Sequence, residues 1–197
     1  MFTKEMVDKV DKFLHENFEI MFEFEFNGLL LLWGGAIKSL IMDAPVNDVD
    51  FVLLTNEKDN ILDFIKKYKL EYRMKNENVY EIKYNDYLID LSANNDLFCH
   101  GYNTDLIFYD IHRKQFLPFG IKQALIKRQV IVYGYQGYPR VEKRQHMKNR
   151  LDIAKKFIQF MNNDNKRVRV IRKNKYYRCM LIGFLKQPSK IKKLFRR

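Results

Sequence analysis

Residues 33–40 read Trp-Gly-Gly-Ala-Ile-Lys-Ser-Leu, and residues 47–51 read Asn-Asp-Val-Asp-Phe. The apolar run from Leu29 to Trp33 predicts a buried strand, and Ala36 to Met42 predicts a short helix after the glycines. Adjacent glycines at such a turn let the backbone approach a ligand closely, and amides at the start of a helix suit phosphate oxygens. Taken alone, Gly34-Gly35 is also typical of a plain turn.

Asp48 and Asp50 open the next apolar strand, predicted from Val49 to Leu54. Residues two apart on a strand point to one face, about 7 Å from each other, so these carboxylates can share divalent ions. Two ions about 3.5–4 Å apart stabilise the attacking and leaving oxygens of an in-line displacement, and magnesium prefers such oxygen ligands. A solvated strand end is the alternative for an isolated Asp-x-Asp, but the preceding strand, Gly-Gly turn and helix favour a metal site.

A third carboxylate, Asp90, stands within the apolar stretch from Tyr87 to Leu91. A carboxylate in such a strand is costly unless it is paired or binds a metal. We therefore predict that Asp90 joins Asp48 and Asp50 as a metal ligand, with an edge strand or a turn as the alternative explanation.

The rest of the chain predicts an α+β fold in which helices pack on a mixed sheet. Helical spacing predicts a helix from Met1 to Phe18 with Thr3 as its N-cap, and alternation predicts a strand from Phe22 to Phe26. Further predicted elements are a helix at Asn60–Tyr68, a hairpin of Tyr80–Tyr84 and Tyr87–Leu91, a strand or buried helix at Leu106–Ile111, a helix at Ile121–Ile126, a strand at Gln129–Tyr133 and an amphipathic helix at Lys143–Met161.

The net charge of +12 is concentrated at one end of the chain. Residues 165–197 contain 13 Lys or Arg and no Asp or Glu, whereas residues 1–164 carry a net charge of −1. Such a block usually meets a polyanion, because each phosphate contact releases condensed counterions. We expect a nucleic-acid-binding segment, with a solvated basic tail as the alternative. The candidate contacts are Lys166, Arg167, Arg169, Arg172, Lys173, Lys175 and Arg178.

A boundary near residue 120 divides the chain into a predicted catalytic domain, 1–120, and a basic helical region, 121–197. The apolar runs are far shorter than the roughly 20 residues that cross a bilayer, and the N-terminus does not resemble a signal peptide. Cys99 and Cys179 indicate neither a disulfide framework nor a zinc cluster. These features predict a cytoplasmic protein with no membrane partner.

The Gly-Gly segment and the Asp-x-Asp strand together resemble the signature of class II CCA-adding enzymes and bacterial poly(A) polymerases. That signature reads Gly-Gly-x-Val-Arg-Asp-x-Leu-Leu-Gly, a short loop with proline, then Asp-x-Asp; this chain has Pro45 in the loop. Ile89-Asp90-Leu91 looks like the third-carboxylate strand of the family. The similarity covers roughly residues 20 to 160 and is most specific around the first motif.

The resemblance implies a polymerase-β-like nucleotidyltransferase head followed by a small neck-like helical module. It implies transfer of a nucleoside monophosphate from an NTP to an RNA 3′ hydroxyl without a template, with two Mg²⁺ ions bound by Asp48, Asp50 and Asp90. Asp90 is also expected to help deprotonate that hydroxyl. Gly34, Gly35 and Lys38 are expected to hold the triphosphate.

This chain departs from the family pattern at several positions. Lys38-Ser39 replaces Arg-Asp, which keeps one positive charge but loses bidentate phosphate geometry. The Arg-Arg-Asp triplet is replaced by the stretch around His100, a candidate triphosphate contact because it takes the place of a family arginine. The family's base-reading motif, Glu-Asp-x-x-Arg, has no counterpart with the same spacing in this chain. Arg140 and Arg144 lie near its expected position and are candidate nucleotide contacts. A reduced and divergent relative is the resulting expectation.

Three functions follow from these patterns. The favoured hypothesis is an RNA nucleotidyltransferase that acts on a tRNA or tRNA-like 3′ end. The second keeps the chemistry but changes the acceptor, as in nucleotidyltransferase toxins and modifying enzymes. The third is a catalytically degenerate protein that only binds RNA, which the loss of the Arg-Arg-Asp triplet supports and the three aspartates oppose.

Overall fold

The computed structural model describes residues 2–24, 28–55, 60–93, 98–99, 102–117, 121–133, 140–173 and 177–178. Its helices are α1 (Lys4–Asn17), α2 (Gly35–Ile41), α3 (Asn60–Lys67), α4 (Ile121–Lys127) and α5 (Arg140–Met161), with short 3₁₀ helices η1 (Glu19–Met21) and η2 (Asn103–Asp105). Its strands are β1 (Leu29–Trp33), β2 (Asp48–Leu54), β3 (Glu71–Asn76), β4 (Val79–Tyr84), β5 (Tyr87–Ala93), β6 (Phe98–Cys99), β7 (Phe108–Asp110), β8 (Gln115–Leu117), β9 (Gln129–Tyr133), β10 (Arg169–Lys173) and β11 (Tyr177–Arg178).

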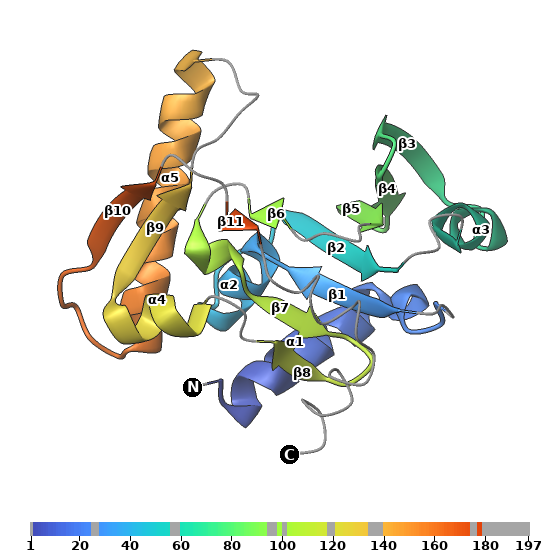
Figure 1. Ribbon diagram of the computed structural model, residues 1–197. Helices are drawn as coiled ribbons and strands as arrows, with labels where there is room; N and C mark the ends of the chain where they lie inside the picture. The colour runs from blue at the N-terminus through green and yellow to red at the C-terminus, as the bar shows by residue number, and fades with distance from the viewer. Residues whose placement is uncertain are drawn as a thin grey trace.

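The fold is built on a seven-stranded mixed sheet in the order β3-β4-β5-β2-β1-β7-β8 (Figure 1). Neighbouring strands run antiparallel, except that β2 and β5 run parallel. Within the described residues, no helix is long and apolar enough to cross a membrane. The predicted α+β class, a mixed sheet with packed helices, is confirmed.

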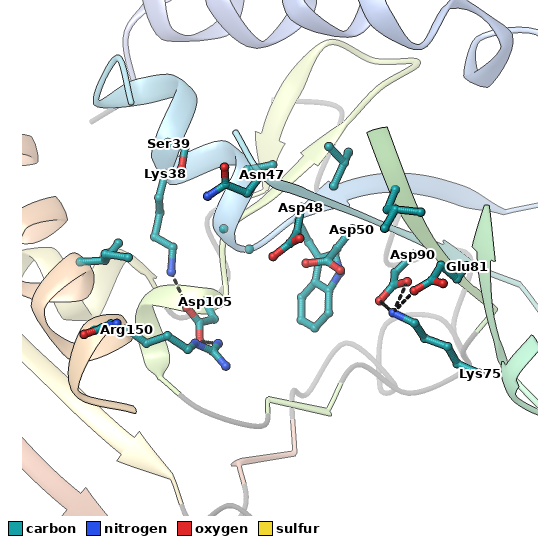
Figure 2. Close-up of a pocket in the computed structure, with 18 residues that line it drawn as sticks. Lys38, Ser39, Asn47, Asp48, Asp50, Lys75, Glu81, Asp90, Asp105 and Arg150 are labelled. Atoms are coloured by element: carbon teal, nitrogen blue, oxygen red, sulfur yellow. Dashed lines mark hydrogen bonds and ion pairs between the residues drawn. The ribbon is translucent and has the colours of Figure 1, made fainter. Parts of the chain in front are cut away.

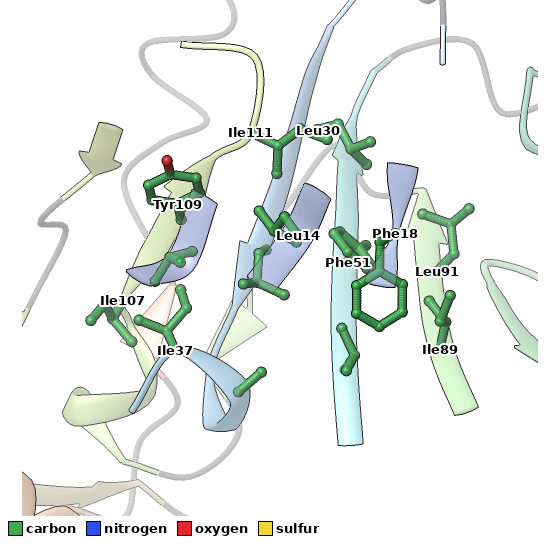
Figure 3. Packing of buried hydrophobic residues seen from close by; sticks show 14 of the residues in the cluster. Leu14, Phe18, Leu30, Ile37, Phe51, Ile89, Leu91, Ile107, Tyr109 and Ile111 are labelled. Carbon is green, nitrogen blue, oxygen red and sulfur yellow. The ribbon is translucent and has the colours of Figure 1, made fainter. Parts of the chain in front are cut away.

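Helix α1 covers one face of this sheet and closes the main core. The Thr3 hydroxyl accepts a hydrogen bond from the Met6 amide at 3.3 Å, so Thr3 is the N-cap that the sequence predicts. Leu14 and Phe18 pack against sheet residues that include Phe51 (Figure 3), and the rings of Phe18 and Phe51 meet edge to face. Burial of each such side chain contributes about 1.5–3 kcal/mol, so this face anchors the sheet.

Strand β2 divides its side chains between the two faces of the sheet. Val49 and Phe51 are buried in the core with α1, and alternation places Asp48 and Asp50 on the opposite face. That opposite face carries a smaller apolar cluster, against which Trp33 packs. The two carboxylates therefore lie beside this smaller cluster, away from the main core.

The hairpin of β4 and β5, strand β9 and helices α2 to α5 agree with the sequence-based predictions. The strand predicted at Phe22–Phe26 is wrong over its described part: Phe22 lies in a turn after η1, and Phe24 has no regular structure. Phe24 is buried instead and packs edge to face on Phe64, at 4.3 Å between ring centroids. Strands β3, β6, β8, β10 and β11 were not predicted: β6, β8 and β11 are only two or three residues long, and β3 is exposed throughout.

Helices α4 and α5 and strands β9 and β10 form a second layer at one end of the sheet, where α5 lies beside the parallel pair β9–β10 (Figure 1). Asn103 of η2 joins this layer to the sheet, because its side-chain amide donates to the Gln129 carbonyl (3.0 Å) and its side-chain oxygen accepts from the Ile131 amide (2.8 Å). The division near residue 120 remains a prediction. An ion pair between Asp105 and Arg150 connects η2 directly to α5.

Candidate active site

The central feature of the candidate site is a row of acidic side chains across three strands. Asp50 of β2 is directly opposite Asp90 of β5, and Asp90 is directly opposite Glu81 of β4. Asp48 lies two residues before Asp50, so it shares the same face. This places four carboxylates next to one another (Figure 2).

The carboxylates of Asp48 and Asp50 have no hydrogen-bond or ion-pair partner among the residues that the structure describes. Burial, and then the charges of Asp90 and Asp48, raise the pKa of Asp50 to about 7, although Lys75 and Arg150 act to lower it. A carboxylate with such a pKa is incompletely ionised near neutral pH. A bound cation would relieve the repulsion that raises its pKa.

Asp90 is held by a lysine from the edge of the sheet. Lys75 of β3 donates to both oxygens of Asp90, at 2.7 and 2.8 Å, and also pairs with Glu81 at 2.8 Å. The hydrogen bond from Lys75, together with its charge, holds the pKa of Glu81 below its usual range. Lys75 therefore neutralises part of the acidic row at the end away from Asp48.

Gly34 forms the turn that brings β1 to the edge of the site. Its φ of +74° lies in the region that residues with a Cβ rarely adopt, and a Cβ there would lie 3.8 Å from an Asp50 oxygen. Gly35, the first residue of α2, has no atom within 4 Å of the position of a Cβ. Of these two glycines, Gly34 alone has a backbone conformation that favours glycine. It keeps the end of β1 close to Asp50.

A second charged cluster lies on the other side of Asp48 and Asp50. Lys38 of α2 and Arg150 of α5 both form ion pairs with Asp105 of η2. Lys38 and Asp105 are almost fully buried, with 5% and 6% of their surfaces exposed. Burial alone would raise the pKa of Asp105, but the positive charges of Lys38 and Arg150 keep it below its usual range.

A cleft of about 660 Å³ joins all of these groups. Figure 2 shows the Lys38–Asp105–Arg150 cluster at one side, Lys75 with Asp90 and Glu81 at the other, and Asp48 and Asp50 between them. Trp33, Gly34 and Gly35 also line the cleft. A volume of this size falls within the range of small-molecule sites, so the cleft can hold a nucleotide-sized ligand.

The cleft brings together six of the residues that the sequence singled out: Gly34, Gly35, Lys38, Asp48, Asp50 and Asp90. His100 lies outside the described residues, as does Lys175, and the side chains of Arg140, Arg144, Arg172, Lys173 and Arg178 are not described. Lys166, Arg167 and Arg169 are exposed next to or at the start of β10. Their roles remain predictions.

Sequence reasoning missed Glu81, Lys75, Asp105 and Arg150. Glu81 alternates with the core residues Tyr80 and Ile82 in the predicted hairpin, so its face could have been predicted. The others gave no local signal. Lys38 and Asp105 are 67 residues apart and Arg150 and Asp105 are 45 apart, so only the folded chain joins them.

The acidic row has the donor chemistry that magnesium requires, but not a closed ligand shell. Among the described residues, no group of three or more His, Cys, Asp or Glu side chains is arranged to hold a metal ion. Magnesium usually keeps several waters and substrate phosphates, so it needs only one or two protein carboxylates. Asp48 and Asp50, which have no described partner, fit that requirement, whereas Asp90 is already bound to Lys75.

No protein-family model and no curated protein sequence matches the chain. Solved structures do match in fold: the apo form of a CCA-adding enzyme is 14% identical, with a TM-score of 0.51 over 98% of this chain and 47% of that chain. The Thermotoga maritima CCA-adding enzyme complexed with tRNA is 18% identical, with a TM-score of 0.47 over 64% of this chain and 34% of that chain. The Bacillus stearothermophilus CCA-adding enzyme in complex with CTP is 11% identical, with a TM-score of 0.42 over 65% and 33%.

The chain spans less than half the length of each of these structures. At such low identities the likeness concerns the fold alone. The match with a TM-score of 0.51 is the evidence for the shared fold. This protein therefore shares the α+β fold of CCA-adding enzymes, with an exposed Asp48 and a half-buried Asp50 on the face of its sheet that lines the cleft.

Proposed function

We propose that the protein is a template-independent nucleotidyltransferase that transfers a nucleoside monophosphate from an NTP to an RNA 3′ end, with a tRNA or tRNA-like acceptor favoured. The observation that carries this proposal is the pair Asp48 and Asp50, which face a nucleotide-sized cleft with no described partner. The shared fold with CCA-adding enzymes supports it.

In this proposal, Asp48 and Asp50 hold divalent ions, with Mg²⁺ the natural choice for carboxylate oxygens. Bound magnesium would neutralise the negative charge of the phosphates and lower the pKa of the attacking hydroxyl. Asp90 completes the acidic row. Because Lys75 holds both of its oxygens, Asp90 must exchange this lysine for a metal ion or for the hydroxyl proton.

The transfer is a single displacement at the α-phosphorus of the NTP. The 3′ oxygen of the acceptor forms a new P–O bond, the bond to the β-phosphate bridging oxygen breaks, and pyrophosphate leaves with that electron pair. The proton of the hydroxyl passes to Asp90 or to solvent. Gly34, Gly35 and Lys38 line the cleft where the triphosphate would lie, and Gly34 leaves room for it beside Asp50.

Positive charge outside the cleft supports an RNA acceptor. Lys166, Arg167 and Arg169 are exposed near β10, and most of the remaining excess charge lies in residues 170–197. Backbone phosphates attract such a segment irrespective of sequence, which suits an enzyme that reads only the end of its substrate. A small-molecule acceptor would not need it.

The test is incubation of the full chain with Mg²⁺, tRNA that lacks its 3′-terminal nucleotides, and each labelled NTP separately. The variant Asp48→Ala/Asp50→Ala removes the proposed metal ligands, and Glu16→Gln/Glu77→Gln removes two exposed acids elsewhere as a matched control. Label on RNA with the wild type and the control, but not with the aspartate variant, supports the proposal. Salt-sensitive RNA binding without label from any NTP would overturn it in favour of RNA binding alone or another acceptor.

A further inference from the structure

The cluster of Lys38, Asp105 and Arg150 takes no part in the acidic row, yet it lines the same cleft. Its members come from three separate elements, α2, η2 and α5. Both carboxylate oxygens of Asp105 accept hydrogen bonds. One accepts from Lys38, and the other accepts from Arg150 and from the Tyr102 amide at 3.2 Å. Both cations are therefore fixed in position by one buried carboxylate.

Contacts with Asp105 and Tyr102 orient Arg150. Its guanidinium pairs with Asp105 and lies over the ring of Tyr102, with 5.6 Å from the guanidinium carbon to the ring centroid. The side chain keeps 29% of its surface exposed while Lys38 keeps 6%, so Arg150 is the cation that the cleft solvent reaches. A planar guanidinium held in this way is preorganised for phosphate, because little of its rotamer entropy is left to lose.

The cluster carries two positive charges and one negative charge. An anion that enters the cleft would meet the solvent-exposed part of Arg150 beside the buried Lys38. The nearest acidic groups in the cleft, Asp48 and Asp50, lie between this cluster and Lys75 (Figure 2).

A nucleoside triphosphate fits this charge pattern better than other anions. One end of its polyphosphate needs cations, and the α-phosphate must reach the groups that hold magnesium. The cleft offers the cations on the Lys38–Arg150 side and the carboxylates beside them. An exposed loop lysine could not provide the same fixed geometry, because its long side chain is free to move.

We propose that Arg150 joins Lys38 in binding the β- and γ-phosphates of the nucleotide, and that Asp105 is a positioning residue that holds both cations for them. This inference rests on the proposed function and deepens it. It assigns the missing bidentate phosphate contact to Arg150 of α5, in place of the Lys38-Ser39 stretch, which carries only a lysine. A bound polyphosphate would thus bridge α2 and α5, which Asp105 already links.

The first measurement is calorimetric binding of inorganic tripolyphosphate and of ATP to the full chain. Arg150→Met removes the guanidinium, Arg150→Lys keeps the charge without the planar fork, and Lys148→Met removes an exposed charge from the same helix as a control. Loss of one charge-assisted phosphate contact weakens affinity about 10- to 100-fold. We expect this for Arg150→Met, an intermediate loss for Arg150→Lys, and less than about a twofold change for Lys148→Met.

Asp105 is tested by Asp105→Asn and by Asp105→Glu, which restores the charge. A positioning role predicts that Asp105→Asn raises KM for the NTP without a matching change in KM for RNA, and that Asp105→Glu recovers part of it. If Asp105→Asn does not fold, Lys38→Met/Asp105→Asn removes the unpaired lysine and permits the same measurement. Unchanged polyphosphate binding by a folded Asp105→Asn protein would show that the cluster only ties α5 to the sheet.

These experiments distinguish a failure of the phosphate subsite from a failure of the proposed nucleotidyltransferase function. Wild-type protein that binds neither tripolyphosphate nor ATP contradicts the nucleotidyltransferase proposal itself. Wild-type binding that Arg150→Met leaves unchanged, with label still transferred to RNA, contradicts the subsite and leaves the nucleotidyltransferase intact.

Discussion

Asp50 and Asp90 face each other across the parallel strands β2 and β5, as direct partners in the strand register. Lys75 neutralises Asp90 but Asp50 has no described partner of its own. Burial, and then the charges of Asp90 and Asp48, raise the pKa of Asp50 to about 7. A divalent ion beside Asp50 would relieve this repulsion.

The variant Asp50→Asn should be less active but more stable. Activity should fall by about 10²–10³-fold, because a charge-stabilising group is lost from the reacting centre. Without divalent ions at pH 8, its free energy of unfolding should rise by about 1–3 kcal/mol, since one pKa unit corresponds to about 1.4 kcal/mol and solvent screens part of the effect.

The pKa of Asp50 is higher in the folded chain than the value of about 3.9 in the unfolded chain, so the wild-type stability deficit grows from about pH 4 to above pH 7. The gain from Asp50→Asn should therefore shrink toward pH 5. Chemical denaturation in EDTA at pH 5 and pH 8 measures both values. A variant that is equally destabilised at both pH values would mean that Asp50 has a favourable partner in solution.

Gly34→Ala should disturb the site, whereas Gly35→Ala should not disturb the fold. The φ of +74° at Gly34 costs about 1–3 kcal/mol for a residue with a Cβ, and the new methyl group would lie 3.8 Å from an Asp50 oxygen. Gly35 lies in α2 with free space around it, and alanine is favoured in helices by up to about 1 kcal/mol. Thermal unfolding of the two variants should shift in opposite directions; equal shifts would argue against the positive φ.

Lys75→Met should strengthen the binding of a divalent ion. Lys75 bonds both oxygens of Asp90, so it competes with any cation for that carboxylate. Its removal also leaves Glu81 and Asp90 side by side, which increases the local negative charge. Titration with Mn²⁺, followed by electron paramagnetic resonance, should give a severalfold lower Kd than for the wild type. Weaker binding would mean that Asp90 is not a metal ligand and that Lys75 organises the strand edge.

Asp105→Asn should destabilise the protein by about 3–5 kcal/mol at pH 7, because it leaves the buried Lys38 without its counter-charge. Although burial would raise the pKa of Asp105, Lys38 and Arg150 hold it below the unfolded value. The ionised group therefore stabilises the folded chain above about pH 4, and this contribution is lost as the pH falls through the folded-state pKa.

The difference in unfolding free energy between wild type and Asp105→Asn should consequently be constant from pH 6 to 8 and shrink only below about pH 4. Urea denaturation across this range measures it. A difference that already disappears at pH 6 would contradict the lowered pKa.

The exposed cations next to β10 should control the salt dependence of RNA binding. Each lost contact with a single-stranded phosphate lowers the slope of log K against log salt by about 0.7. The variant with Lys166, Arg167 and Arg169 changed to alanine should therefore lose up to about 2 from that slope. A control with alanine at the exposed Lys4, Lys12 and Lys66 should keep it. Equal slopes for both variants would show only a general effect of net charge.

Local sequence patterns were sufficient to predict the unit from β1 through α2 to β2, because each of its elements has its own periodicity. Alternation in β2 alone places Asp48 and Asp50 on the face opposite Phe51. The glycine turn is likewise a local property, since only glycine readily adopts the φ of Gly34. These features would be expected in any fold that contained the same segment.

Where the local sequence pattern and tertiary packing favoured different secondary structures, packing determined the structure. The alternating phenylalanines at Phe22 and Phe24 favour a strand, but Phe24 gains more from burial against Phe64 than from pairing at a sheet edge. Strand β3 shows the reverse case: all of its residues are exposed, and it forms because β4 offers it an edge.

The sequence by itself thus determined the two aspartates, their common face, the turn beside them and the basic character of the chain end. Tertiary structure decided which groups meet them. Placement of β5 parallel to β2 brings Asp90 to Asp50, and the packing of α5 near η2 brings Arg150 to Asp105 and Lys38. Contacts between residues 40 to 67 positions apart leave no periodic trace in the sequence, because they depend on how whole elements pack and not on the spacing within any one of them.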